Sequence, residues 1–485
     1  MSRTPDPVSA SLVSASTVAL PTPWSWRFAI AAAMVSVAAA AWLLQSTIGP
    51  RGQAAAGICC FFGLVALFSS NLRAVNWRTI GWGFGLQFVL ALLVLKGQVE
   101  IGGRLYSVKN AIARVGDVFK VFIGFSDRGA EFVFGNLAQP QHMAHVFGAS
   151  YLFPFVFKAL PPILFVSAFF TVLYHYGLVQ WCVRLMARVM VSLMHTSGAE
   201  TLSVATNVFM GQTEAPLIVK AYVPRMTNSE LFTLMVSGFA HISGGMMFVY
   251  INYGADPTAV LTTCVMACPC SLYLAKLFLP ERGQPETAST AQTQQEKSPY
   301  VNAIDAAASG TIDGLRLALN VAAMLIVFIA FVAMFDALLA AIKPALLWLG
   351  VSTNVLGGWP DDLSLGMLFG WLFSPAAFLM GIEAADMQKV GSLLGSKLAI
   401  NEHFAYLQFK MLKEANPDFL TPRSQVLTAF ALTGFANFAS VGVQLGGIGA
   451  LAPERRHDLA RLGGRALFVG FTATLLNAAM AGMML

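Results

Sequence analysis

Charged residues are scarce in this sequence. They make up 11% of its 485 residues, against roughly 25% in an ordinary soluble domain. Hydrophobic residues make up 56%, and the mean hydropathy is +0.66. These values exclude an ordinary soluble protein and predict a polytopic α-helical membrane protein, with room for on the order of ten spans of about 20 residues each.

Motifs for metal binding and hydrolysis are also absent. Three of the six cysteines lie close together, at positions 264, 268 and 270. Pro269 separates two of them and no histidine lies near in sequence, so we expect buried thiols rather than a metal cluster. Neither Gly-x-Ser-x-Gly nor His-Glu-x-x-His occurs, and the pair His142 and His145 has no acidic partner in the surrounding sequence. A membrane-embedded enzyme is therefore disfavoured.

The basic residues lie mostly in the connections between apolar segments. Arg73 and Arg78 occupy the short turn between the second and third segments, which places this turn, and by parity the N-terminus, in the cytoplasm. Arg3 and Arg27 agree with this orientation, whereas Arg51 does not. The net charge of +6 forms no patch for nucleic acid, so no such partner is predicted. We expect a multi-pass protein of the plasma membrane, the inner membrane in a bacterium.

The stretch from Asn207 to Pro216 is polar, although the segments on both sides are long and apolar enough to lie in a bilayer. Gly211 and Pro216 both oppose a continuous helix, so the sequence predicts two short half-helices joined by a turn. Broken backbone in a membrane is tolerated only where protein or a water-filled cavity satisfies its N–H and C=O groups. The stretch should therefore line a cavity, with Glu214 as a candidate functional residue.

The second half of the chain repeats this pattern. A pair of apolar segments ends in a second polar group, Asn401-Glu402-His403. Further on, Gly434-Phe435-Ala436-Asn437 matches Gly238-Phe239-Ala240-His241 of the first half. Weak internal similarity with paired breaks is typical of proteins built from inverted repeats, whose binding site lies between the repeats. The predicted fold class is an all-α polytopic membrane protein with two inverted repeats, re-entrant helical hairpins and broken helices.

Four motifs together carry a family resemblance. They are Gly211-Gln212-Thr213-Glu214-Ala215-Pro216, Asn401-Glu402, Gly434-Phe435-Ala436-Asn437 with Ser440, and Leu445-Gly446-Gly447 leading to Leu451-Ala452-Pro453. In this order they resemble the concentrative nucleoside transporters, from about Phe61 to the C-terminus. The resemblance implies a homotrimer in which each protomer has a fixed scaffold and a mobile transport domain. That domain would carry a nucleoside across the bilayer by an elevator motion driven by a cation gradient.

Composition and the resemblance together divide the chain into seven predicted segments. The N-terminal tail is rich in Ser, Thr and Pro and lacks the features of a signal peptide. The segments are a disordered cytoplasmic leader (1–26), N-terminal transmembrane helices (27–100), interfacial helices and scaffold (101–195), a first repeat hairpin with transport helices (196–280), a soluble linker (281–310), a scaffold helix (311–360), and a second repeat hairpin with transport helices (361–485).

The resemblance also implies substrate contacts. It assigns Gln212, Thr213 and Glu214 to the nucleobase, Phe435 to its ring, Glu402, Asn437 and Ser440 to the ribose hydroxyls, and Met246 to the pocket wall. The chemistry agrees, because a carboxylate accepts well from vicinal hydroxyls and an amide with a hydroxyl suits a base edge. Without the motifs, Gln212 or Asn437 could equally hold helices together, and Met246 could equally belong to the core.

A coupling ion is implied in the same way. In sodium-coupled members a side-chain amide, a small hydroxyl residue and two backbone carbonyls hold the ion, at the positions of Asn207, His241, Met210 and Ile242. His241 departs from this pattern, because a hard cation prefers oxygen ligands and an imidazole titrates near neutrality. Either the ring points aside and only its carbonyl binds sodium, or the protein couples to protons. We favour sodium.

The sequence therefore predicts a nucleoside:sodium symporter, for substrates such as uridine, and no enzyme. It predicts no cofactor beyond the coupling cation, and the nucleoside and the lipid bilayer as partners. A proton-coupled nucleoside symporter is the alternative. A channel would not need two deep carboxylates, and an ion-independent facilitator would share every binding residue and differ only in coupling. The sequence does not rank purine against pyrimidine nucleosides.

Overall fold

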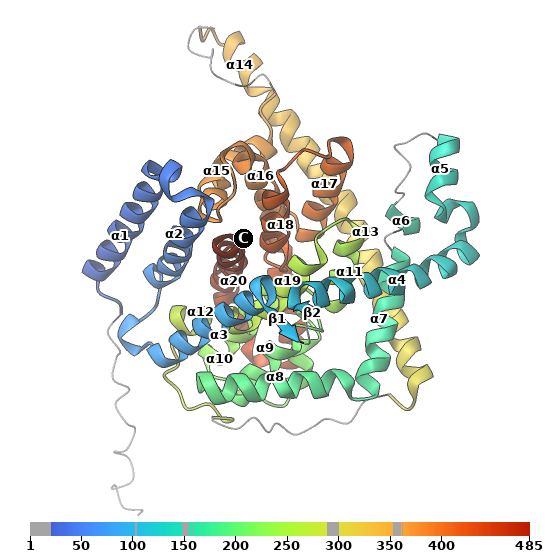
Figure 1. Ribbon diagram of the computed structural model, residues 1–485, viewed down its shortest axis with the longest axis horizontal. Coiled ribbons are helices and arrows are strands. Elements are labelled where there is room, and N and C mark those ends of the chain that lie inside the picture. Colours follow the sequence, from blue (N-terminus) through green and yellow to red (C-terminus); the bar gives the residue numbers. More distant parts are fainter. Residues whose placement is uncertain are drawn as a thin grey trace, which may run out of the picture.

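A computed structural model describes residues 21–101, 104–147, 155–158, 160–288, 300–352, 360 and 362–485. Over these residues the chain is almost entirely α-helical (Figure 1). The exception is an antiparallel pair, β1 (Gln98–Ile101) and β2 (Arg104–Ser107), in which Gln98 lies opposite Ser107. Seven of the described helices are long and apolar enough to cross a membrane, or up to eight if a bent pair counts as one span. The predicted helical, polytopic fold is confirmed.

The chain begins with α1 (Trp24–Leu43), α2 (Gln45–Leu67) and α3 (Trp77–Lys96); α1 and α2 lie at one edge of the molecule, and α3 runs from there toward its middle (Figure 1). Near its start α2 is kinked at Gly49, whose φ is 61° and which is followed by Pro50. In the packing, α2 lies on α20 (Arg456–Met484) and α3 lies on α12 (Pro257–Phe278). Only 6% of the most apolar window of α1 is buried, so this helix lies mainly exposed on the outside of the chain.

The middle of the chain supplies an outer layer of helices. Its elements are α4 (Val108–Phe134), α5 (Pro140–Phe147), α6 (Phe155–Lys158), α7 (Leu160–His175), α8 (Leu178–Met194), α13 (Ala303–Ala340) and α14 (Ile342–Trp348). The chain bends by 73° between α7 and α8, where Gly177 has a φ of 80°. Helices α7 and α13 pack along each other. The window 329–348, at the outer end of α13 and in α14, is 0% buried, which leaves a large apolar surface for lipid or another subunit.

The polar stretch after residue 206 breaks the chain as predicted, but its two limbs differ. The first limb is α9 (Gly198–Thr206), which ends directly before Asn207. After the turn at Gly211 the chain forms two 3-10 turns, η4 (Ala215–Val219) and η5 (Val223–Arg225). Each turn contains a proline, Pro216 or Pro224, which lacks an N–H and removes an α-helical hydrogen bond. The prediction of two half-helices is therefore right for the first limb and wrong in helix type for the second.

Helices are broken in both halves of the chain, as predicted. In the first half, α10 (Asn228–Ala240) and α11 (Gly244–Asn252) are separated by three residues. In the second half, α18 (Pro422–Leu432) and α19 (Phe438–Leu451) are separated by five. The N–H of Phe435 donates to the carbonyl of His241 at 3.0 Å, so the two breaks lie against each other. The remaining helices are α15 (Leu365–Leu379), α16 (Met387–Ala399) and α17 (Glu402–Ala415).

The two Gly-Phe-Ala triplets do not occupy equivalent places. Ser243 caps the helix after the first break and Asn437 caps the helix after the second. In the first half the triplet ends α10, whereas in the second it lies inside the break. There Gly434 has a φ of 133°, a backbone conformation that favours glycine. Measured from the caps, the sequence match is out of register by two residues.

The core lies in the helices that flank the breaks. The most apolar windows of the broken pair α10–α11, of α12 and of α20 are each 89% buried. Two predicted boundaries shift. Helix α13 begins at Ala303, inside the predicted linker 281–310, and α1 begins at Trp24, inside the predicted leader. Residues 1–20 and 289–299 lie outside the described residues.

Candidate functional site

The candidate site lies where the polar turns meet the broken helices. The turn after α9 contributes Gln212, the start of α17 contributes Glu402, and the second break contributes Asn437 with Ser440 one turn later. All four side chains are buried. Hydrogen bonds connect them across as many as 228 residues of sequence. The structure therefore brings together four of the eight predicted substrate contacts.

Glu402 is held by two donors. Its Oε1 accepts from the hydroxyl of Tyr250 at 2.9 Å, and its Oε2 accepts from Nδ2 of Asn437 at 2.8 Å. Asn401 caps α17 and places Glu402 in the first turn, where the helix dipole favours a negative charge. The ring of Tyr250 stacks on Tyr406 at 4.3 Å between centroids, which restricts its rotation. The carboxylate is thus a pre-oriented acceptor for charge-assisted hydrogen bonds.

Gln212 and Ser440 form a second linked set. Nε2 of Gln212 donates to Oγ of Ser440 at 3.1 Å, and Nε2 of Gln444 donates to Oε1 of Gln212 at 3.0 Å. The backbone N–H of Ser440 donates to Oδ1 of Asn437 at 2.8 Å. A continuous chain of polar contacts therefore runs from Glu402 to Gln444. A ligand with several hydroxyl or amide groups can replace members of such a chain without leaving polar groups unpaired.

Glu214 does not join this chain. Its Oε2 accepts from the N–H of Gly211 at 2.6 Å, and its side chain is exposed to a cavity of about 330 Å³. The cavity lies between the first polar turn and helices α7 and α13, and Lys220 and Asp313 also line it. Its volume is in the range of small-molecule pockets. The structure thus places Glu214 in the lining of this cavity and outside the hydrogen bonds of the polar chain.

Three further predicted contacts are placed without a polar role. Met246 is buried among core residues, and its N–H donates to Oγ of Ser243 at 3.3 Å. Thr213 lies against Gly447, where an added Cβ would come within 3.1 Å of its methyl group. Phe435 is half-buried and follows Gly434 in the second break. Their assignment to substrate binding stays a prediction.

The predicted ion ligands lie at the first break. Nδ2 of Asn207 donates to Oγ of Ser237 at 3.1 Å, while its Oδ1 is buried and has no hydrogen-bond partner in the described part of the chain. Nδ1 of His241 lies 2.9 Å from the carbonyl of Ser237, so the ring turns back toward its own helix. Met210 lines the cavity beside Glu214, and Ile242 is fully buried. An unpaired, buried amide oxygen is the kind of group that binds a hard cation.

Sequence reasoning missed three residues that hold this site. Gln444 carried a usable signal, because Asn437, Ser440 and Gln444 follow each other at spacings of three and four on one helical face. Tyr250 and Ser237 carried none, since each is a lone polar residue in an apolar segment. Only the fold places Tyr250 beside Glu402, 152 residues away.

A buried lysine stands beside the second break. Nζ of Lys397 donates to the carbonyl of Ala431 at 2.7 Å and to Oγ1 of Thr474 at 3.0 Å. Ala431 belongs to the last turn of α18, whose final carbonyls have no partner within the helix, so Nζ of Lys397 satisfies one of them. Lys397 thereby stabilises the broken backbone that carries Asn437.

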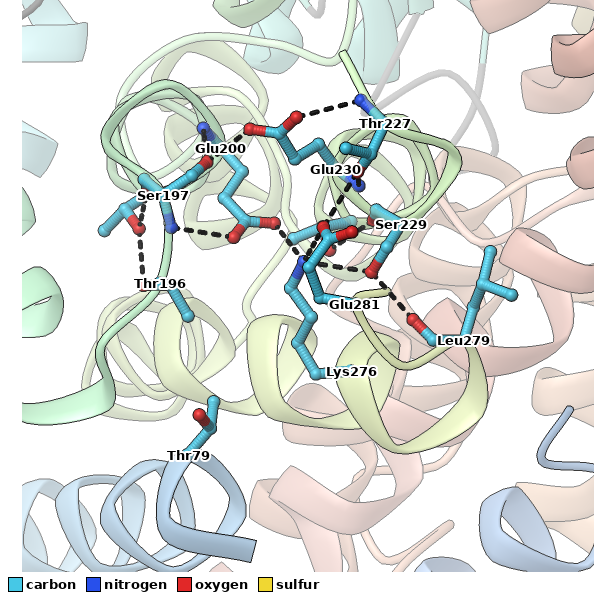
Figure 2. Close-up of polar contacts among 12 residues, drawn as sticks. Thr79, Thr196, Ser197, Glu200, Thr227, Ser229, Glu230, Lys276, Leu279 and Glu281 are labelled. Atoms are coloured by element: carbon cyan, nitrogen blue, oxygen red, sulfur yellow. Dashed lines mark hydrogen bonds and ion pairs between the residues drawn. The ribbon is translucent and has the colours of Figure 1, made fainter. Parts of the chain in front are cut away.

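A cluster of charged side chains holds the base of the first hairpin, where α9 begins (Figure 2). Nζ of Lys276 lies 2.8 Å from Oε2 of Glu200, 3.3 Å from Oε2 of Glu281 and 3.0 Å from Oγ of Ser229. Glu230 accepts from Oγ of Ser197 at 2.6 Å. Lys276 and Glu200 are nearly inaccessible, with side chains 8% and 1% exposed, so their attraction is little screened by water.

Two capping boxes place two of the three carboxylates of this cluster. Ser197 with Glu200 caps α9, and Thr227 with Glu230 caps α10, which satisfies N–H groups that a helix start leaves free. The segment after α12 closes the arrangement, because Thr287 accepts from the N–H groups of Gly198 and Ala199 at 3.0 Å. The base of the hairpin is therefore joined to α10 and α12 as one unit.

Comparison with known proteins covers nearly the whole chain. Three family models match: Na+ dependent nucleoside transporter N-terminus over residues 56–137, Nucleoside recognition over 156–256, and Na+ dependent nucleoside transporter C-terminus over 259–482. Sodium/nucleoside cotransporter 1 of Homo sapiens is 37% identical over 440 residues, which is 88% of this chain and 63% of that protein. An uncharacterized transporter of Haemophilus influenzae is 36% identical over 88% of this chain and 96% of its own length.

Solved structures of CNTnw are also similar. The inward-facing, substrate-bound state superposes with a TM-score of 0.79 at 33% identity, covering 90% of this chain and 98% of the other. A variant in an outward-facing state gives 0.80 at 32% identity over the same shares. The chain spans 63% of the length of sodium/nucleoside cotransporter 1 from mouse, human and rat.

Proposed function

This chain belongs to the concentrative nucleoside transporter family, and we propose that it imports nucleosides by symport with sodium. The observation that carries the proposal is the buried chain of polar contacts from Glu402 to Gln212, held between two broken helices. It offers a fixed carboxylate for ribose hydroxyls and an amide for a base edge. Glu214 lines a cavity that would give a nucleoside a route toward these groups. The family is one of transporters rather than enzymes.

The mechanism we propose is alternating access by movement of a transport domain against a scaffold. CNTnw, with the same fold, has been captured in inward-facing and outward-facing states, which supports such a movement. The joined base of the first hairpin, with α10 and α12, would move as part of the transport domain. Helices α7 and α13, on the other side of the cavity, would belong to the scaffold. Glu214, which lines the cavity at this boundary and accepts only from the N–H of Gly211 within the described residues, suits a site that opens and closes as the two parts separate.

Uptake of radiolabelled uridine into proteoliposomes tests the function. An inward sodium gradient is expected to drive accumulation above the outside concentration, and an outward gradient is expected to prevent it. A facilitator would equilibrate uridine without accumulating it. A channel would show flux that does not saturate with uridine. Either of these results would contradict symport.

Sodium is the proposed coupling ion. The buried Oδ1 of Asn207, unpaired within the described residues, supports it, and the ring of His241 turned toward Ser237 fits binding through the His241 carbonyl alone. Ion binding would order the turn after α9 and so raise nucleoside affinity. By linkage, the nucleoside would raise sodium affinity by the same factor. The alternative is proton coupling, with His241 carrying the charge.

Two variants separate these alternatives. Asn207→Ala is expected to raise the sodium concentration for half-maximal uridine uptake about tenfold, as for the loss of one contact to a charged group. His241→Ser is expected to keep or strengthen sodium dependence, because it restores a hydroxyl oxygen beside the ion. Sodium coupling would be contradicted if uridine uptake by wild type did not depend on sodium and rose with an inward proton gradient. In that case His241→Ser should flatten the pH dependence of uptake between about pH 5 and 8.

We further propose that the protein is a homotrimer in the plasma membrane, the inner membrane of a bacterium. The apolar residues of α4 that stay exposed, among them Val118, Val121 and Phe125, and the unburied outer end of α13 support an interface formed by the scaffold. Mass measured in detergent, corrected for the bound micelle, is expected to equal three chains. A stable monomer that retains transport after reconstitution would contradict the proposal.

A further inference from the structure

A pocket of about 450 Å³ lies where α1, α2 and α3 reach one end of the molecule. It is lined by Pro21, Thr22, Pro23, Trp24, Arg27 and Arg73. Two arginines and a tryptophan thus share one small opening, and no carboxylate lines it among the described residues. The pocket lies far from the polar chain in sequence, and neither of its arginines takes part in the site described above.

Hydrogen bonds hold the wall of this pocket in place. Thr22 is buried, and its Oγ1 donates to the carbonyl of Ser69 at 3.0 Å and accepts from the N–H of Leu72 at 3.1 Å. The same turn is bound to the end of α12, because Oγ of Ser69 donates to the carbonyl of Leu277 at 2.6 Å and the N–H of Ser70 donates to that of Phe278. The start of α1 is therefore fixed to the body of the protein, and the pocket is preformed.

The arginines are oriented but largely unpaired. The guanidinium of Arg27 lies 5.2 Å from the ring centroid of Trp24, and that of Arg73 lies 5.4 Å from that of Trp26. Each guanidinium carries five N–H donors. Within the described residues, one donor of Arg27 is used, in a bond of 3.4 Å to the carbonyl of Ser69, and its Nε is buried without a partner. Arg73 donates no side-chain hydrogen bond within the described residues. Donors in this arrangement suit a phosphate.

The surroundings of the pocket are those of a membrane interface. Trp24, Trp26 and Trp77 are 72%, 44% and 57% exposed, and tryptophan gathers at the level of lipid headgroups. Next to the pocket, Phe28 is 70% exposed on α1, whose apolar side is free to contact acyl chains. A ligand with one anionic phosphate and two apolar chains therefore matches the pocket and the helix beside it.

We propose that this pocket binds the phosphate of an anionic phospholipid headgroup, with Arg27 and Arg73 as its donors and the acyl chains along α1. Each basic residue near an anionic lipid surface raises the affinity for that surface about fivefold. This proposal involves neither the substrate nor the coupling ion. Its test is therefore independent of the test of the proposed transport function.

The test uses the purified full-length chain, stripped of lipid in detergent and offered equal phosphatidylglycerol and phosphatidylcholine, with bound lipid counted by native mass spectrometry. Wild type is expected to retain phosphatidylglycerol preferentially. The double variant Arg27→Gln/Arg73→Gln is expected to lose this preference by about 25-fold, and Arg73→Gln alone by about fivefold. Arg73 is exposed and its guanidinium contacts the ring of Trp26 without donating a hydrogen bond within the described residues, so the single variant is expected to leave the fold intact.

Two controls complete the experiment. Arg282→Gln/Arg461→Gln removes the same charge from exposed positions outside the pocket and is expected to keep the wild-type preference. Inorganic phosphate and glycerol 3-phosphate are added as soluble competitors that resemble the headgroup. They are expected not to displace phosphatidylglycerol, because they lack acyl chains. Displacement by free phosphate, an unchanged preference in the double variant, or an equal loss in the control pair would each overturn the proposal.

Discussion

Replacing Lys276 with methionine is expected to lower the free energy of unfolding by about 3 to 5 kcal/mol, the usual effect of removing one partner of a buried ion pair. Methionine keeps most of the length of the lysine stem, so the change is mainly the loss of the charge. Glu200, 1% exposed, would then lack the ammonium at 2.8 Å, and Glu281 would lack it at 3.3 Å. Unfolding by heat or denaturant in detergent, followed by tryptophan fluorescence, measures the difference.

A surface pair provides the matched control. Arg225 and Glu286 lie 3.0 Å apart with side chains 63% and 43% exposed, so Arg225→Gln is expected to change stability by no more than about 1 kcal/mol. Both variants remove one positive charge from the base of the first hairpin. If both variants lowered the free energy of unfolding equally, the buried ion pairs of Lys276 would contribute no more stability than an exposed ion pair.

The same cluster predicts a pH dependence. Burial raises the pKa of Glu281, but Lys276, the hydroxyl of Thr227 and the N–H of Gly283 outweigh it and hold that pKa below its usual value. A lowered pKa contributes stability that is present above the pKa of the unfolded chain and is lost as the pH falls through the folded pKa. Wild type should therefore lose this contribution in acid. Lys276→Met lacks the ammonium, which is the main group that lowers the pKa of Glu281. The difference in free energy of unfolding between wild type and the variant should therefore become smaller as the pH falls below the usual pKa range of a glutamate.

The cluster also marks the limit of what the sequence could predict. The broken polar stretch was predictable, because Gly211, Pro216 and a carboxylate inside an apolar region disfavour a continuous membrane-spanning helix and favour a broken one that lines a cavity. Lys276 was not, since a lone lysine near the end of an apolar segment is an ordinary feature of a span. Two of its partners come from other helices, Glu200 in the capping box of α9 and Ser229, 47 residues away, at the start of α10, and only the packing of α9, α10 and α12 brings them to one ammonium.

Local chemistry decided the remaining differences from prediction. Pro216 and Pro224 turn the second limb of the first hairpin into 3-10 helix, where the sequence predicted a second half-helix. The Gly-Phe-Ala repeat signalled paired breaks correctly but not their register, because the helix after each break starts at its capping residue, Ser243 or Asn437. A cap needs only a short polar side chain. It can therefore move along the sequence while the surrounding motif stays where it is.

Glu402→Gln is expected to weaken nucleoside binding by about 1.5 to 3 kcal/mol, the net value of a hydrogen bond to a charged group. The fold should tolerate the change. The new amide can offer its oxygen to Nδ2 of Asn437 and its NH2 group to the hydroxyl of Tyr250, which accepts as well as donates. Both existing contacts, at 2.8 and 2.9 Å, then survive in neutral form. What disappears is the negative charge that would accept from desolvated ribose hydroxyls.

Equilibrium binding of uridine and of uracil to the purified variant separates this effect from a general loss of structure. Uridine is expected to bind roughly 10-fold to 150-fold more weakly than to wild type, while uracil, which has no ribose, should change little. Glu414→Gln is the matched control, because Glu414 lies on the same helix with its side chain 60% exposed. Uridine affinity equal to wild type in Glu402→Gln would remove Glu402 from the ribose site. An equal loss for uracil would instead indicate that Glu402 acts by holding the two broken helices together through Asn437 and Tyr250.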